Sequence, residues 1–146
     1  MRHSNRWIVA VVLIIVSLQL VACGQTPASP ASSPPARVER LGQGLSRVIL
    51  TAEAAKRLGI QTALVSDAQV GGTPREVVPY SAVFYDPNGE TWVYTNPEPL
   101  TFVRDHITVD SINGDVAVLS GGPPSGTAVV TVGASELYGT EFGVGQ

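Results

Sequence analysis

Residues 91–119, TWVYTNPEPLTFVRDHITVDSINGDVAVL, carry the clearest β-strand pattern of the chain. The first five residues of this stretch alternate in character, so a strand places Trp92 and Tyr94 on one face and Val93 on the other. The sequence Asn-Pro-Glu-Pro at 96–99 then breaks the extended pattern. Short strands separated by turns are therefore expected here.

The next residues, Leu100 to Ile112, continue the alternation as one expected strand. One face carries Val103, Ile107 and Val109, and the opposite face carries Phe102, Arg104, His106, Thr108 and Asp110. Asn113-Gly114 is a two-residue hairpin signal, and Val116 to Leu119 returns as a further strand.

Upstream of this stretch, residues 47–65 predict a strand–helix–strand unit. Arg47 to Leu50 and Ile60 to Val65 are the two expected strands. Between them, Thr51 can cap the start of a helix, and Gly59 can take the left-handed conformation that ends it. The helix is barely two turns long, so packing has to hold it.

The remaining segments complete a β-rich domain. Ser66 to Glu76 is expected to be a loop, Val77 to Tyr85 a strand, Thr127 to Val132 the last strand, and Ala134 to Tyr138 a helical turn. Together the segments predict an all-β fold, a small β-barrel or sandwich of short antiparallel strands with one short helix. The folded domain is expected to span residues 45–146.

The N-terminus has the three parts of a secretory signal peptide. Arg2 and Arg6 precede an apolar run of about 16 residues, Trp7 to Ala22, which is shorter than the roughly 20 residues of a comfortable transmembrane helix. We therefore expect residues 1–22 to be a cleaved signal peptide. An uncleaved anchor helix is the alternative.

The single cysteine, Cys23, ends the sequence Leu20-Val21-Ala22-Cys23, which resembles the lipobox of bacterial lipoproteins. The resemblance implies that Cys23 is acylated and that membrane lipid is a partner of the chain. Residues 23–44 are then the lipidated cysteine and a Pro/Ser/Ala-rich tether, whose part QTPASPASSPPA cannot fold by itself. The expected location is the cell envelope, with the protein anchored in a membrane and facing the periplasm or the extracytoplasmic side.

The charge balance argues against a nucleic-acid partner. Without Arg2 and Arg6 the chain has seven basic and twelve acidic residues, a net charge near −5, whereas nucleic-acid-binding domains present a basic face. With Cys23 acylated, no thiol remains for a zinc site, a disulfide or a nucleophile. We expect no cofactor, no metal site and no catalytic residue, and the chain is expected not to be an enzyme.

His106 is the one histidine of the mature chain, and it lies next to Asp105. It is either a proton or metal site or a solvent-facing histidine on a strand. A single histidine without cysteine makes a poor transition-metal site, so we favour the second interpretation. A hydrolase triad would need His106 as its base, and no serine of the chain has a nucleophile-elbow pattern.

The C-terminal sequence ELYGTEF, residues 136–142, places Leu137, Tyr138 and Phe142 among polar residues and glycine. One interpretation is a segment that folds back on the β domain. The other is a partner-docking surface made by these three residues, because exposed aromatic side chains anchor interfaces.

Residues 77–139 resemble the membrane-proximal domain of the periplasmic adaptor subunits (membrane-fusion proteins) of RND-type efflux pumps. The matching features, in order, are VPYSAVFYD, TWVY, a following Phe-Val-Arg strand, a strand after NGD, GPPSGTAVVTVGA and ELYG. Upstream, VILTAEAAKRLGIQTALV is similar to the strand–helix–strand that opens the folded part of heavy-metal-type adaptors. Family members carry a lipoyl-like domain and a helical hairpin between these two parts, and here only residues 66–76 join them.

The resemblance implies a membrane-proximal domain alone, lipid-anchored and non-enzymatic, that acts in transmembrane efflux through protein–protein contact with an inner-membrane RND transporter. Self-association into a homo-oligomer is a further expectation for such a domain. The alternative is a small lipoprotein that binds a ligand or an envelope component without a pump partner. An envelope hydrolase is the third hypothesis.

Overall fold

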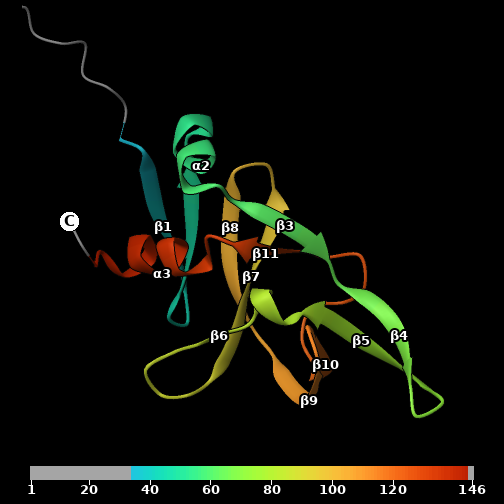
Figure 1. Ribbon diagram of the computed structural model, residues 1–146. Coiled ribbons are helices and arrows are strands. Elements are labelled where there is room, and N and C mark those ends of the chain that lie inside the picture. The colour runs from blue at the N-terminus through green and yellow to red at the C-terminus, as the bar shows by residue number, and fades with distance from the viewer. Residues whose placement is uncertain (1–33, 145–146) are drawn as a thin grey trace, which may run out of the picture. The chain divides into compact units, whose positions relative to one another are not determined.

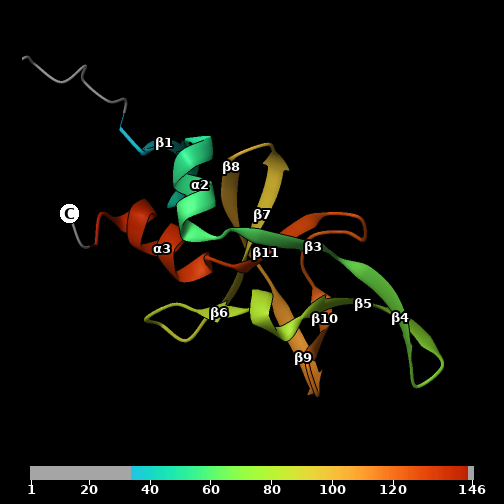
Figure 2. The ribbon, with the colours of Figure 1, turned by 45° about the horizontal axis from the view of Figure 1, so that its top comes forward.

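The computed structural model describes residues 34–144. The expected signal peptide at 1–22, the lipidation site Cys23 and the tether up to residue 33 lie outside the described residues. The described residues form two antiparallel sheets and two short helices, which confirms the all-β prediction (Figures 1 and 2).

The larger sheet has seven strands, in the order β1-β2-β8-β7-β11-β3 with β6 paired to β7. Its strands are β1 (Ala36–Gly42), β2 (Leu45–Leu50), β3 (Gln61–Leu64), β6 (Phe84–Tyr85), β7 (Thr91–Glu98), β8 (Thr101–His106) and β11 (Ala128–Val132). The smaller sheet has the order β4-β5-β10-β9. Its strands are β4 (Ser66–Val70), β5 (Thr73–Pro79), β9 (Thr108–Asn113) and β10 (Val116–Gly121). Within residues 34–144 neither sheet closes on itself, so the barrel alternative is not confirmed.

The expected single strand from Leu100 to Ile112 is two strands, β8 and β9, which belong to different sheets. They meet at Ile107, whose side chain is fully buried between the sheets. The backbone N–H of Ile107 donates to the Thr91 carbonyl at 3.0 Å, and the Thr91 hydroxyl donates to the Ile107 carbonyl at 2.7 Å. Sequence alternation alone does not reveal this change of sheet, because Ile107 fits the same apolar face on either side of it.

The expected loop at Ser66 to Glu76 is instead most of a β-hairpin, β4 and β5, with partners from Ser66↔Val77 to Val70↔Thr73. Gly71 and Gly72 close it with φ angles of 59° and 83°. Two consecutive positive φ values suit the tight turn of a two-residue hairpin, and glycine adopts them without strain.

The ordered fold also begins earlier than expected. Residues 36–42, which fall in the stretch predicted as tether, form the edge strand β1 and pair with β2 from Ala36↔Leu50 to Gly42↔Leu45. Similarly, β7 extends to Glu98, into the break expected at residues 96–99, with a register irregularity between Thr95 and Glu98.

Two hydrophobic cores lie on the two faces of the larger sheet. The first fills the space between the sheets and consists of Val65, Val78, Ala82, Val93, Ile107, Ala117, Leu119 and Val129. The second lies between the larger sheet and the helices and consists of Val48, Leu50, Ala54, Tyr94, Phe102, Val130 and Leu137. Val93 and Tyr94 enter different cores, as the strand alternation of residues 91–95 predicts.

The helices α2 (Ala52–Leu58) and α3 (Ala134–Phe142) cover the second core. At the start of α2 the Thr51 hydroxyl accepts from the Ala54 N–H at 3.1 Å, and Gly59 ends the helix with φ 64°, as predicted. Helix α3 runs beyond the expected turn at Ala134 to Tyr138 and ends at Phe142. In residues 34–144 we find no helix that is long and apolar enough to span a membrane.

Candidate interaction surface

Three ring side chains lie in register across the strands β6, β7 and β8. Phe84 is opposite Trp92, and Trp92 is opposite His106. Directly opposed residues of antiparallel strands point to the same face, so the three rings form one row. The ring centroids of Trp92 and His106 are 5.1 Å apart in an edge-to-face arrangement. This row stands on the helix-covered face of the larger sheet, because Tyr94, two residues after Trp92, packs in the second core.

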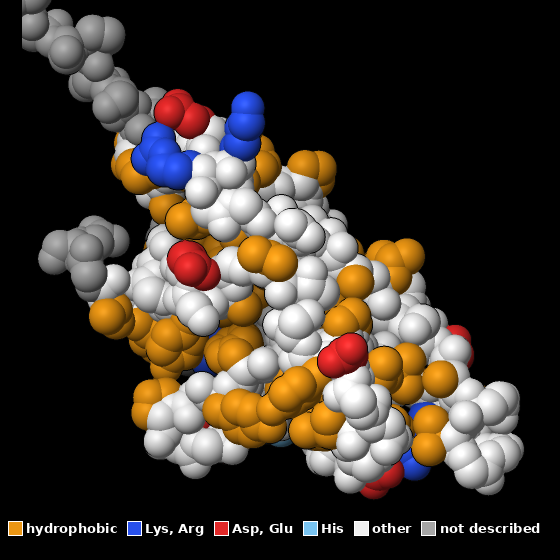
Figure 3. Space-filling model, viewed as in Figure 1, with side chains coloured by type: hydrophobic (Ala, Val, Ile, Leu, Met, Phe, Trp, Pro, Cys, Tyr) orange, Lys and Arg blue, Asp and Glu red, His pale blue; other side chains and the backbone are white. Residues whose placement is uncertain are grey.

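Helix α3 adds two more rings to this row. Tyr138 contacts Phe84 edge to face at 5.8 Å between centroids, and Phe142 lies 4.6 Å from Tyr138. Phe142 is 50 % exposed. We call Phe84, Trp92, His106, Tyr138 and Phe142 the aromatic surface. Hydrophobic side chains gather over α3 and near β6 in Figure 3.

A buried charged cluster lies beneath the aromatic surface. The Arg104 guanidinium donates through Nε to both carboxylate oxygens of Glu141, at 3.1 and 3.0 Å. The Tyr94 hydroxyl donates to Glu141 Oε2 at 2.6 Å. The side chains of Arg104 and Glu141 are only 7 % and 1 % exposed, so the ion pair is almost completely removed from water.

Arg104 connects four parts of the fold. Besides Glu141 on α3, its Nη2 donates to the Gly44 carbonyl in the β1–β2 turn at 3.0 Å. Its guanidinium carbon also lies 4.5 Å from the Trp92 ring centroid and 5.0 Å from that of Phe142. A buried charge is stable only when it is paired and hydrogen-bonded. Arg104 meets this requirement through Glu141 and the Gly44 carbonyl together. The cluster therefore fixes α3, and with it Tyr138 and Phe142, against the sheet.

The same cluster perturbs the titration of Tyr94. Burial, and then the hydrogen bond to the Glu141 carboxylate, raise the pKa of Tyr94 far above its ordinary value. Ionisation of the phenol would place a second negative charge beside Glu141 inside the protein.

This pKa shift predicts an alkaline loss of stability. Above a pH of about 10 an unfolded Tyr94 releases its proton while the folded one keeps it. The free energy of unfolding therefore falls as the pH rises above about 10, by up to roughly 1.4 kcal/mol per pH unit from this residue. We expect Tyr94→Phe to lose stability less steeply than wild type between about pH 10 and 11 in urea titrations. Equal slopes in the two proteins would contradict the assignment.

The structure separates the three predicted docking residues. Leu137 is fully buried in the second core, so it cannot contact a partner while α3 stays packed, and its inclusion in the docking set is corrected. Tyr138 is partly buried and Phe142 is half exposed. The strand residues Phe84 and Trp92 were missed because Phe84 meets Tyr138 of α3, and Trp92 meets Arg104, only through tertiary packing. Their aromatic character was the available signal.

The sequence also singled out His106 and Cys23 and raised the question of a metal site. His106 faces solvent at the end of β8, beside Trp92. Cys23 lies outside the described residues. Among residues 34–144 there is no group of three or more His, Cys, Asp or Glu side chains placed to hold a metal ion.

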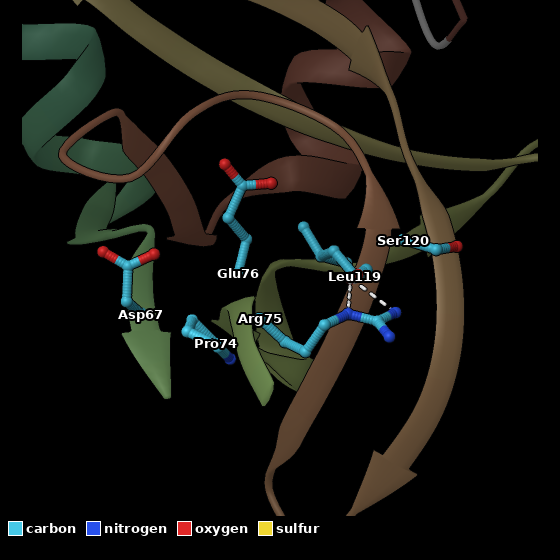
Figure 4. Close-up of a pocket in the computed structure, with 6 residues that line it drawn as sticks. All are labelled: Asp67, Pro74, Arg75, Glu76, Leu119 and Ser120. Carbon is cyan, nitrogen blue, oxygen red and sulfur yellow. Dashed lines mark hydrogen bonds between the residues drawn. The ribbon is translucent and has the colours of Figure 1, made fainter. Parts of the chain in front are cut away.

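An open pocket of about 490 Å³ lies on the smaller sheet (Figure 4) and is lined by Asp67, Pro74, Arg75, Glu76, Leu119 and Ser120. Its one cationic side chain is already engaged. Arg75 donates to the Leu119 carbonyl at 3.2 and 3.1 Å and pairs with Asp110 at 3.4 Å. In Figure 4 the carboxylates of Asp67 and Glu76 point away from the guanidinium. The pocket therefore offers no free positive charge for an anionic ligand.

No family model matches the chain, and no curated protein matches it. Among solved structures, it is similar to the NMR structure of a 180-residue fragment of SilB from Cupriavidus metallidurans CH34, which holds the N-terminal metal-binding site and the membrane-proximal domain of that protein. The identity is 24%, the TM-score is 0.46, and the match covers 57% of this chain and 48% of the SilB fragment. The match thus extends over about half the length of that fragment.

Proposed function

We propose that this chain is a lipid-anchored, non-enzymatic envelope protein with the role of an efflux adaptor's membrane-proximal domain. In this proposal Cys23 carries the lipid, and the described domain contacts an inner-membrane transporter of the RND type. Tyr138 and Phe142, with Phe84 and Trp92 beside them, form the contact. If the transporter is an oligomer, the proposal includes self-association of the domain.

The sequence supports the proposal through the order and extent of its motifs. The adaptor-like features run from Val48 to Val65 and from Val77 to Gly139, and the lipobox-like sequence ends at Cys23. No single one of these motifs is specific, but their succession along one chain favours an adaptor domain exported to the envelope.

The single observation that carries the proposal is the aromatic surface fixed by a buried ion pair. Interface hot spots are enriched in aromatic residues and arginine, and they work best when they are already ordered before binding. Here Phe142 is half exposed and Tyr138 partly so, while Arg104 and Glu141 hold the helix that carries them. The binding partner therefore meets rings whose positions are already set, and little side-chain freedom is lost on contact.

Site-specific photo-crosslinking in the native host tests this contact. We expect a benzoylphenylalanine placed at Phe142 of the full chain to form an adduct with an RND-type transporter polypeptide, identified by its peptide masses. The reason is that Phe142 is 50% exposed and therefore accessible to a partner. The same photo-reactive residue at Ile112 on β9 of the smaller sheet is the matched control, because Ile112 is 44% exposed and lies outside the aromatic surface.

An adduct with the transporter from position 142 but not from position 112 supports the proposal. Adducts of equal yield from both positions, or adducts that contain no transporter polypeptide in cells that express one, contradict it.

A further inference from the structure

The charges of the described domain are divided unequally between its two parts. Residues 34–58 carry five basic and two acidic side chains, a net charge of +3. Residues 59–144 carry two basic and ten acidic side chains, a net charge of −8. The first part is β1, β2 and α2, and we call it the basic end. Its basic residues are Arg37, Arg40, Arg47, Lys56 and Arg57.

Internal pairing leaves part of this positive charge available. Glu39 pairs with Arg37 at 3.0 Å and lies 3.7 Å from Arg47, and Glu53 pairs with Arg57 at 2.9 Å. Arg40 and Lys56 make no ion pair with any residue in 34–144. Glu98 lies in the neighbouring β7–β8 hairpin. The basic end keeps a net positive charge when the charge of Glu98 is added to it.

The chain enters the described domain at this end. Arg57 lines a small apolar groove together with Ala36, the first residue of β1, and Pro35, the residue before it. In Figure 3 blue side chains gather where the described chain begins, over β1 and α2. Any attachment upstream of Pro34 therefore connects directly to the basic end.

The number of residues after Cys23 limits how far the domain can lie from a lipid attached there. Eleven residue steps separate Cys23 from Pro34. Eleven steps of a polypeptide chain can span at most about 40 Å. A group anchored at Cys23 thus holds the basic end at high effective concentration next to the membrane.

We infer that the basic end of this domain lies against a bilayer surface that carries anionic lipid headgroups. Each Lys or Arg close to such a surface is attracted to it, while the net charge of −8 on the rest of the domain is repelled. Attraction and repulsion together orient the domain, with β1 and α2 toward the lipid and the bulk of its acidic side chains away. This inference rests on the proposed membrane anchoring but not on the proposed transporter contact.

Lys56 makes the inference testable because it is the only lysine of the whole chain. The full chain is placed in nanodiscs of phosphatidylcholine alone or with about 30% phosphatidylglycerol, which supplies the anionic headgroups. The rate at which Lys56 is acetylated by a neutral N-hydroxysuccinimide ester is then measured by mass spectrometry. We expect the rate to be at least about threefold lower in the anionic discs, and to recover in about 0.5 M NaCl, where the Debye length is only a few ångströms.

Two variants of equal net charge provide the control. Arg40→Glu removes positive charge from the basic end and should abolish most of the protection of Lys56. Gln69→Glu combined with Thr73→Glu changes the net charge by the same amount on the exposed β4–β5 hairpin and should leave the protection intact.

Equal Lys56 reactivity in the two lipids, or equal loss of protection in both variants, overturns the inference. Failure of the anchoring looks different, because a chain without an anchor leaves phosphatidylcholine discs during size exclusion. If it then stays only on the anionic discs, with Lys56 protected, the basic surface is supported although the anchor is not.

Discussion

Glu141→Ala is expected to lower the free energy of unfolding by about 3–5 kcal/mol, the usual cost of removing one partner of a buried ion pair. The Arg104 guanidinium would stay buried under α3 with its strongest acceptor gone. The Tyr94 hydroxyl would lose its acceptor at the same time. The charge of Arg104 cannot be neutralised by deprotonation, so the fold carries the full desolvation cost.

Urea denaturation of wild type and variants measures this effect. Glu136→Ala is the matched control, because Glu136 lies on the same helix but is exposed, and we expect it to stay within about 0.5 kcal/mol of wild type. The triple variant Tyr94→Phe/Arg104→Met/Glu141→Leu should recover most of the lost stability, since it removes both charges and the Tyr94 hydroxyl that Glu141 accepts from, and keeps apolar volume. A loss below about 1 kcal/mol for Glu141→Ala would show that the cluster does not hold α3.

The second large effect is expected for Leu137→Ala, with a loss of about 2–5 kcal/mol, as for other buried leucines. Leu137 is fully buried in the core that α2 and α3 cover, so truncation leaves a cavity beneath α3. Phe142→Ala, on the same helix, should stay within about 1 kcal/mol because its ring is half exposed.

The two α3 variants also separate packing from binding. If the aromatic surface is the contact, Phe142→Ala weakens the association with the transporter while the thermal unfolding transition hardly moves. Leu137→Ala also weakens the association, but only together with a lower midpoint of thermal unfolding. A Leu137→Ala protein of wild-type stability would mean that the segment 136–142 does not pack as described, and a Phe142→Ala protein with unchanged association would remove Phe142 from the contact.

Helix α3 is thus the element on which fold and proposed function depend together. Glycines at both ends have positive φ, 96° at Gly133 and 67° at Gly143, so the helix starts and stops sharply between them. The charged cluster fixes its last turn and Leu137 fixes its middle. Its aromatic residues, Tyr138 and Phe142, belong to the aromatic surface.

Local patterns in the sequence determined much of this fold. The alternation of Trp92, Val93 and Tyr94 fixed which side chains share a face, and Thr51 and Gly59 bounded α2. The all-β class followed from the number of short strands and turns. These features depend on residues close together in the chain, where period and turn chemistry act directly.

Tertiary structure decided the rest. Alternation says that Phe102 and Arg104 share a face, but only the arrival of α3 makes that face a buried one and pairs Arg104 with Glu141, 37 residues further on. The change of sheet at Ile107 and the edge strand β1 likewise depend on distant partners. The physical reason is that burial belongs to pairs of elements, whereas a sequence pattern describes one element at a time, and the aromatic surface exists only where two elements meet.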